Sequence, residues 1–152
     1  MPPKTADRIE KTAELRASRA RVWKAIADSR EFGTWFGAAL DGAFVAGKPV
    51  SGRITHPGFE HLKFELDVER IEPERLFAFR WHPYAVDPKV DYSSEPTTLV
   101  ELRLAENAGA TRVTIVESGF ERIPAARRDE AFRMNGQGWE IQLGNLARHV
   151  AS

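Results

Sequence analysis

The amino-acid sequence predicts an α+β domain in which an antiparallel sheet is covered by one long helix. Several segments between residues 38 and 118 alternate apolar and polar side chains and are joined by short turns, and a stretch of about 124–150 keeps helical periodicity throughout. Strands that follow one another through short turns pair antiparallel, and such a sheet buries one face. Only the C-terminal stretch is long enough to cover that face.

The first strand is predicted over residues 8–16, "RIEKTAELR", and Ser18 after it is a good N-cap for a helix. Two short helices follow, "RARVWKAIADS" and "SREFGTWFG", and the glycines at 33 and 37 keep the second one short. Each helix has an apolar face, made of Val22, Trp23 and Ile26 in the first and of Phe32, Trp35 and Phe36 in the second.

Six further strands are predicted before the final helix. Two short ones surround a turn at 47–49, and glycines inside them, at 42 and 52, often mark bulges or curvature. The other four alternate cleanly, with inward positions at Leu62, Phe64, Leu66 and Val68; Phe77, Phe79 and Trp81; Val100, Leu102 and Leu104; and Val113 and Ile115. A polar loop at 83–96 interrupts this series, and Ile123-Pro124 opens the helix.

Composition limits the class of protein. The chain has 152 residues, with 42% hydrophobic and 29% charged residues, which is typical of one globular domain, predicted over residues 8–152 after a flexible tail of residues 1–7. Lysine and arginine balance aspartate and glutamate, 22 to 22, so nothing indicates nucleic-acid binding. No apolar run suits membrane insertion, and the absence of cysteine fits a reducing compartment, so we expect a cytoplasmic protein.

Two glycines interrupt the long helix in "RMNGQGWEIQL", residues 133–143. Each interior glycine costs a helix about 1 kcal/mol relative to alanine. On a helical wheel, Gly136 lies beside Trp139 on the face that Phe132, Leu143, Leu146 and Val150 share, with Asn135 and Gln142 on its flank. Either Gly136 lets the sheet approach closely, or it leaves space for a bound molecule.

Three segments resemble the SRPBCC (START-like) superfamily, and within it the branch named after activators of the heat-shock-protein-90 ATPase. They are "TAELRASRARVWKAIADSREFGTWF", "TRVTIVESGF" and "GWEIQLGNLARHV", and the resemblance extends over about residues 8–150. It implies a helix-grip fold, in which a curved seven-stranded antiparallel sheet wraps around the C-terminal helix with a cavity between them. Because relatives include lipid carriers, cyclases and co-chaperone domains, fold alone does not decide function.

We expect a small hydrophobic or aromatic molecule to bind in that cavity, since the inward faces are rich in aromatic residues. The predicted ligand-binding residues are Phe64, Phe79, Trp81, Glu117, Phe132, Asn135, Gly136, Trp139, Gln142 and Leu143.

Glu117 is the one acidic residue in phase with the inward Val113 and Ile115. A buried carboxylate must be paired, hydrogen-bonded or neutral. It either orients a ligand or acts as a general base; otherwise Gly119 turns it outward, or it pairs with Arg53 or Arg80.

No metal site or cofactor is predicted. His56 and His61 flank a turn with Pro57 and Gly58 rather than a helix, although His56 and His82 could line a pocket mouth. Arg127 and Arg128 are expected to be solvated or to pair with neighbouring acidic residues.

Two alternatives to the binding module stay open: a cyclase or hydrolase that uses Glu117, and a domain that modulates a chaperone ATPase. The loop at 83–96 is interpreted as a lid, a homodimer contact or a solvated segment.

Overall fold

The computed structural model describes residues 8–87 and 89–151, so the predicted flexible tail of residues 1–7 lies outside the described part. Its elements, in chain order, are β1 (Arg8–Leu15), α1 (Arg19–Ala27), α2 (Ser29–Phe36), β2 (Ala38–Leu40), β3 (Pro49–Ile54), β4 (Lys63–Glu72), β5 (Leu76–Trp81), β6 (Thr98–Asn107), β7 (Ala110–Ser118), the 3-10 turn η2 (Phe120–Arg122) and α3 (Ala125–Ala151). The predicted α+β class and element order are confirmed; η2 was not predicted.

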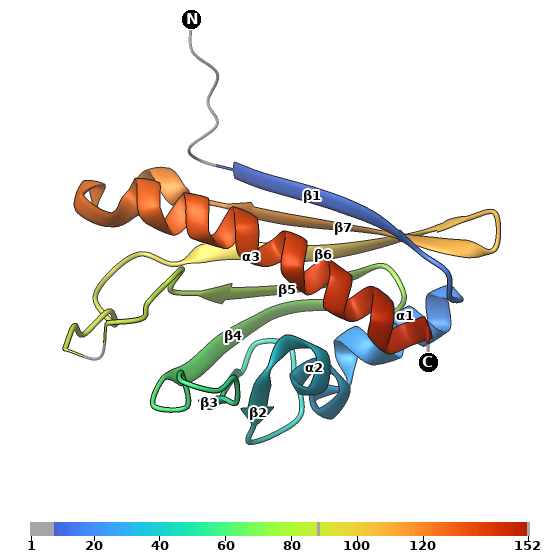
Figure 1. Cartoon of the computed structure of the whole chain (residues 1–152), viewed down its shortest axis with the longest axis horizontal. Coiled ribbons are helices and arrows are strands. Elements are labelled where there is room, and N and C mark those ends of the chain that lie inside the picture. The colour runs from blue at the N-terminus through green and yellow to red at the C-terminus, as the bar shows by residue number, and fades with distance from the viewer. Residues whose placement is uncertain (1–7, 88, 152) are drawn as a thin grey trace, which may run out of the picture.

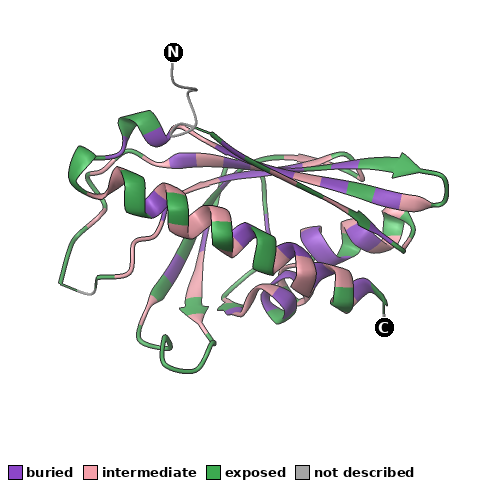
Figure 2. Cartoon of the chain, turned by 45° about the horizontal axis from the view of Figure 1, so that its top comes forward, coloured by how far each residue is buried: buried purple, intermediate pink, exposed green. Residues whose placement is uncertain are grey.

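The seven strands form one antiparallel sheet in the order β1-β7-β6-β5-β4-β3-β2. The long helix α3 crosses one face of this curved sheet, while α1 and α2 lie at the end where α3 finishes (Figure 1). Buried positions recur along α3 and alternate along the strands, as an amphipathic helix over a half-buried sheet requires (Figure 2). None of the described helices is long and apolar enough to span a membrane.

The short helices begin and end where the sequence provides caps. The Ser18 hydroxyl accepts a hydrogen bond from the Arg21 backbone N–H at 3.1 Å, as predicted. Asp28 caps α2 in the same way, through the N–H of Arg30 at 2.9 Å. Gly37 then ends α2 in the left-handed conformation, with φ of 93°.

The core is more aromatic than the strands alone predict. Trp139, Leu143, Leu146 and Val150 of α3 are buried, as the wheel indicates, whereas Phe132 is only half-buried. Side chains from outside the long elements also enter the core. The ring centre of Phe44, which precedes β3, lies 4.8 Å from that of Phe77, and the ring centre of Phe36 in α2 lies 6.0 Å from that of Trp139. Leu62, predicted to face inward from a strand, lies instead in the turn before β4.

Two glycines, one inside a predicted strand and one inside the predicted long helix, have opposite surroundings. A Cβ on Gly52 would lie 1.9 Å from the carbonyl oxygen of Ala39, so β2 can pair with β3 only because residue 52 has no side chain. A Cβ on Gly136 would meet nothing within 4 Å, and the same holds for Gly138. Close packing against the sheet therefore does not explain Gly136 or Gly138.

These surroundings predict opposite effects for one added methyl group. We expect Gly52→Ala to lower the free energy of unfolding by about 1–3 kcal/mol, because the backbone must move to make room for the methyl group. The matched change Gly136→Ala should raise it by about 1 kcal/mol through helix propensity. Urea denaturation measures both, and a destabilising Gly136→Ala would contradict the open space seen at that position.

Candidate functional site

The carboxylate of Glu117, on β7, lies in the interior with no solvent exposure. It accepts hydrogen bonds from four side chains: Thr98 Oγ1 at 2.6 Å, Trp81 Nε1 at 2.8 Å, Trp139 Nε1 at 2.8 Å and Asn135 Nδ2 at 3.1 Å. Indole nitrogens can only donate, so the arrangement presents donors to both carboxylate oxygens.

The sheet register and the helix bring these groups together. Trp81 pairs with Thr98 across β5 and β6, and Val100 pairs with Glu117 across β6 and β7, which makes Thr98 the diagonal neighbour of Glu117. Asn135 and Trp139 are four residues apart and therefore lie on one side of α3. Four elements, β5, β6, β7 and α3, thus meet at one carboxylate.

The alternatives in which Glu117 turns outward or pairs with arginine are wrong. The donors lie on the inward side, and the Arg80 guanidinium binds Glu69 instead, at 3.0 Å. Burial raises the pKa of Glu117 above its ordinary value of 4.5, although the hydrogen bonds from Thr98, the two indoles and Asn135 act in the opposite direction.

The space expected beside Trp139 is filled by other rings. The Trp81 and Trp139 indoles stack with centroids 5.6 Å apart and an interplanar angle of 27°. Phe36 lies 6.1 Å from Trp81 and 6.0 Å from Trp139. These rings occupy the space between Trp139 and the sheet, so the open volume lies to the side of Trp139.

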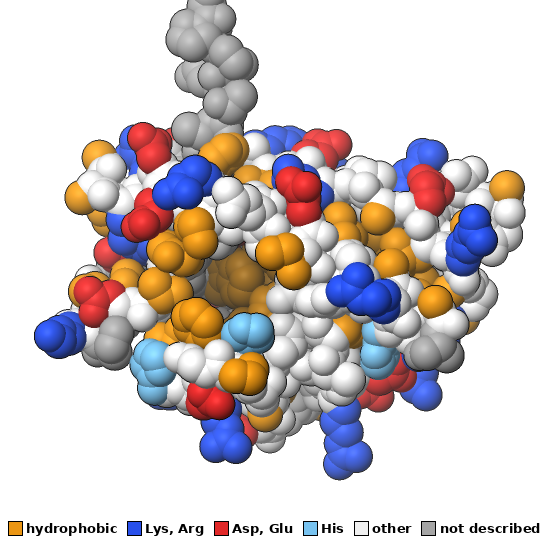
Figure 3. Space-filling view, in the orientation of Figure 1, with side chains coloured by type: hydrophobic (Ala, Val, Ile, Leu, Met, Phe, Trp, Pro, Cys, Tyr) orange, Lys and Arg blue, Asp and Glu red, His pale blue; other side chains and the backbone are white. Residues whose placement is uncertain are grey.

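Two neighbouring grooves provide that open volume. The aromatic groove, of about 550 Å³, is lined by Phe36, Phe64, Trp81, Tyr84 and Tyr92, together with Asn135. The outer groove, of about 880 Å³, lies between α2, the segment before β4 and the second half of α3, and the two grooves share Phe36, Ile54 and Leu62. Figure 3 shows a hollow with mostly hydrophobic walls and histidine side chains at its edge.

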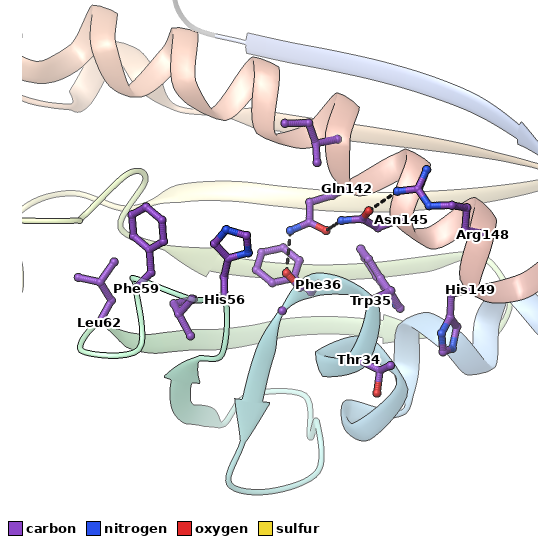
Figure 4. Close-up of a pocket in the computed structure, with 13 residues that line it drawn as sticks. Thr34, Trp35, Phe36, His56, Phe59, Leu62, Gln142, Asn145, Arg148 and His149 are labelled. Atoms are coloured by element: carbon purple, nitrogen blue, oxygen red, sulfur yellow. Dashed lines mark hydrogen bonds between the residues drawn. The ribbon is translucent and has the colours of Figure 1, made fainter.

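One wall of the outer groove is polar. Gln142 donates to the Phe36 carbonyl at 2.8 Å, Asn145 donates to Gln142 at 3.1 Å, and Arg148 donates to Asn145 (Figure 4). His56, Phe59 and Leu62 face this chain from the opposite side of the groove (Figure 4). The helix side of the groove is therefore fixed by hydrogen bonds.

The structure divides the predicted ligand-binding residues into separate places. Phe64, Trp81 and Asn135 line the aromatic groove, Gln142 lines the outer groove, Leu143 lines a shallow groove beside β1, and Phe79, Glu117, Phe132, Gly136 and Trp139 line none of these. Sequence reasoning did not assign Phe36, Tyr84 or Tyr92 to the site. Only the amphipathic face of α2 gave a signal for Phe36; the tyrosines lie in a loop without periodicity.

The loop at 83–96 is attached to the start of α3 by Arg127. Its guanidinium lies 2.9 Å from Glu95 Oε1 through Nε, donates to the Pro83 carbonyl at 2.7 Å, and lies 4.7 Å from the centre of the Tyr92 ring. Arg127 is thus paired with the loop rather than solvated or bound to its acidic neighbours on the helix. This attachment holds one wall of the aromatic groove.

Histidines line both grooves, and His149 joins His56 in the outer one. His56 lines the outer groove, and His61 and His82 line the aromatic groove. Within residues 8–87 and 89–151, no three histidine or acidic side chains gather as metal ligands would.

Comparison with known proteins identifies the family. The family described as "Activator of Hsp90 ATPase homolog 1-like protein" matches residues 16–151. The chain belongs to this family. The resemblance drawn from its sequence is therefore confirmed, while no curated protein sequence matches the chain.

Solved structures of this family's fold are similar over nearly the whole chain. A protein from Arthrobacter aurescens has a TM-score of 0.78 at 18% identity, covering 99% of this chain and 90% of that one. The Aha1 dimer from Colwellia psychrerythraea has a TM-score of 0.71 at 15% identity, covering 94% and 95%. DynU16, a protein of the dynemicin biosynthetic locus, has a TM-score of 0.74 at 24% identity; the match covers 96% of this chain but 48% of DynU16. At these identities the likeness shows the fold.

The hydrogen bond from Thr98 gives a direct test of the carboxylate site. Thr98→Val keeps the shape of the side chain and removes the donor of the shortest of the four hydrogen bonds. We expect it to lower the free energy of unfolding by about 1.5–3 kcal/mol, the range for hydrogen bonds to charged groups. Thr114→Val is the matched control, since the Thr114 hydroxyl makes only a 3.3 Å contact with Thr12. Equal effects of the two changes would contradict a special role for the Thr98 donor.

The raised pKa of Glu117 predicts a pH dependence of stability. The folded protein holds the proton of Glu117 more tightly than the unfolded chain does. The stabilisation that this proton provides is therefore complete below pH 4.5 and is lost as pH rises through the folded-state pKa. Relative to Glu117→Gln, the natural protein should therefore become less stable as pH rises above 4.5. The lowered pKa values of Glu14 and Glu31 act in the opposite direction, but both proteins carry these residues. Urea denaturation across the pH range checks this, and a constant difference would refute it.

Proposed function

We propose that the protein is a binding module for a small apolar or aromatic molecule, and that the aromatic groove is its binding site. The observation that carries this proposal is the lining of that groove, where five aromatic side chains surround a volume suited to a small molecule. An apolar molecule that enters it leaves water for an aromatic surface, which is favourable by about 25 cal/mol for each Å² buried.

Hydrogen bonds and ring stacking in the core hold two residues of the groove wall in place, which favours selective binding. Trp81 is held by its hydrogen bond to Glu117 and by its stack on Trp139, and Asn135 is held by the same carboxylate. A wall that is already ordered loses little conformational entropy on binding. Asn135 donates to Glu117 through its amide nitrogen, so its amide oxygen remains as an acceptor that can orient a ligand.

The other functions considered from the sequence have less support. Glu117 lines neither groove, so a role as general base lacks access to a substrate in this geometry. A chaperone-modulating role rests on the family description alone, and a homodimer rests on similarity to the Aha1 dimer from Colwellia psychrerythraea. Both stay predictions, as does the cytoplasmic location.

Filling the aromatic groove tests this function. Ala85→Trp places a large ring in the loop wall of the groove, whereas Val45→Trp places the same ring at an exposed position that lines neither groove. With the neutral fluorescent probe N-phenyl-1-naphthylamine, we expect Ala85→Trp to weaken binding at least about tenfold, a loss of about 1.4 kcal/mol, and Val45→Trp to leave it unchanged. Absence of probe binding to the natural protein, or equal binding by both variants, would overturn the proposal.

A further inference from the structure

We infer that the aromatic groove selects organic cations, namely apolar or aromatic molecules that carry an ammonium group, over neutral molecules of the same shape. This inference rests on the proposed function and names the ligand class. Three independent features of the groove support it: the aromatic faces, the charge behind them and the charges at the mouth.

The aromatic faces are the first feature. Phe36, Phe64, Trp81, Tyr84 and Tyr92 surround one space, and the face of an aromatic ring attracts a cation through its quadrupole. Tyr92 already has a guanidinium, that of Arg127, at 4.7 Å from its ring centre. The charge of that arginine is matched by Glu95, 2.8 Å away, so it leaves no positive excess at the groove.

The buried carboxylate is the second feature. All four hydrogen-bond donors to Glu117 are neutral groups, and none of the ion pairs formed by the described residues includes it. Two of those donors, Trp81 and Asn135, also line the groove. A cation placed against them would lie close to an ionised carboxylate across protein rather than water, where attraction is stronger. The hydrogen bond from the indole N–H to that carboxylate also polarises the Trp81 ring in the sense that attracts a cation.

The charges at the mouth are the third feature. Besides the tyrosines, six titratable side chains line the groove, namely His61, Lys63, Glu65, His82, Asp87 and Asp91. Lys63 lies 3.9 Å from Glu65, so these two offset each other. Asp87 and Asp91 instead accept backbone N–H bonds from Lys89 and Ser93 within the loop. Counted without the histidines, the lining carries three carboxylates and one ammonium group, which is an excess of negative charge.

The outer groove has a cationic side chain at one end, where Arg148 lies among its lining residues; His149 beside it is bound to Glu31, 2.8 Å away. An anionic ligand would bind there rather than against Trp81. The sign of the preferred charge therefore distinguishes the two grooves.

Three probes that share a benzyl group test the inference on the natural protein: benzyltrimethylammonium, its neutral isostere neopentylbenzene, and phenylacetate. Binding is followed by the chemical shift of the Trp81 indole N–H, with Trp23, which lines neither groove, as the internal reference. We expect the cation to bind at least about tenfold more tightly than the isostere, and phenylacetate to bind more weakly than both. Equal binding of cation and isostere, or tighter binding of phenylacetate, would overturn the inference while leaving the proposed function intact. No binding by any of the three would overturn both.

Variants then locate the source of the selectivity. Asp87→Asn with Asp91→Asn, on the exposed loop, should weaken binding of the cation severalfold more than binding of the isostere. Affinity for the cation should rise with pH as Glu117 ionises, and Glu117→Gln should flatten this rise. Because His61 and His82 line the same groove, His61→Asn with His82→Asn serves as the control and should keep the Glu117-dependent part. A rise that survives Glu117→Gln and disappears in the histidine variant would refute the contribution of the carboxylate.

Discussion

A carboxylate without solvent contact is the constraint on which the interior of this protein depends. Removing such a group from water costs several kcal/mol unless hydrogen bonds replace the lost hydration. Trp81, Thr98, Asn135 and Trp139 supply those bonds from three different elements, and Glu117 itself comes from a fourth. A one-residue slip of β6 against β7 would turn Glu117 toward the other face and leave two indole N–H groups buried without acceptors. The requirement therefore fixes the register of the sheet and the position of α3 together.

The location of the groove follows from the same requirement. Since both indoles must reach Glu117, Trp81 and Trp139 stack on each other, and Phe36 closes the remaining space from α2. This packing excludes a ligand from the centre of the sheet. Beyond Trp81 the strands end and the loop at 83–96 continues, held to α3 by Arg127. The open volume thus forms between the Trp81 ring and a loop that the contacts of Arg127 attach to α3.

Local patterns predict the elements, and long-range partners decide the site. The alternation in β4 to β7 and the single long helix were sufficient to predict the fold. The phase of Val113 and Ile115 was sufficient to predict that Glu117 faces inward. The donors to Glu117 were beyond prediction because they lie 18 to 36 residues away in sequence and depend on sheet register. The same reason explains why the pocket was expected beside Trp139: nothing local to Phe36 indicates that its ring fills that space. Close packing of the sheet against Gly136 was excluded only once its neighbours were known.

The hydrogen bonds to Glu117 offset the loss of helix propensity at Gly136 and Gly138. Residues 135–139 contain two helix-weakening glycines at a combined cost of about 2 kcal/mol, and a Cβ added to either would meet nothing within 4 Å. Asn135 and Trp139, on either side of them, bind Glu117, and each hydrogen bond to an ionised carboxylate contributes about 1.5–3 kcal/mol. This turn of the helix is therefore held by its contact with Glu117 rather than by its own propensity. Because Asn135 also lines the aromatic groove, any change in the charge of Glu117 acts on the groove wall and on the helix at once.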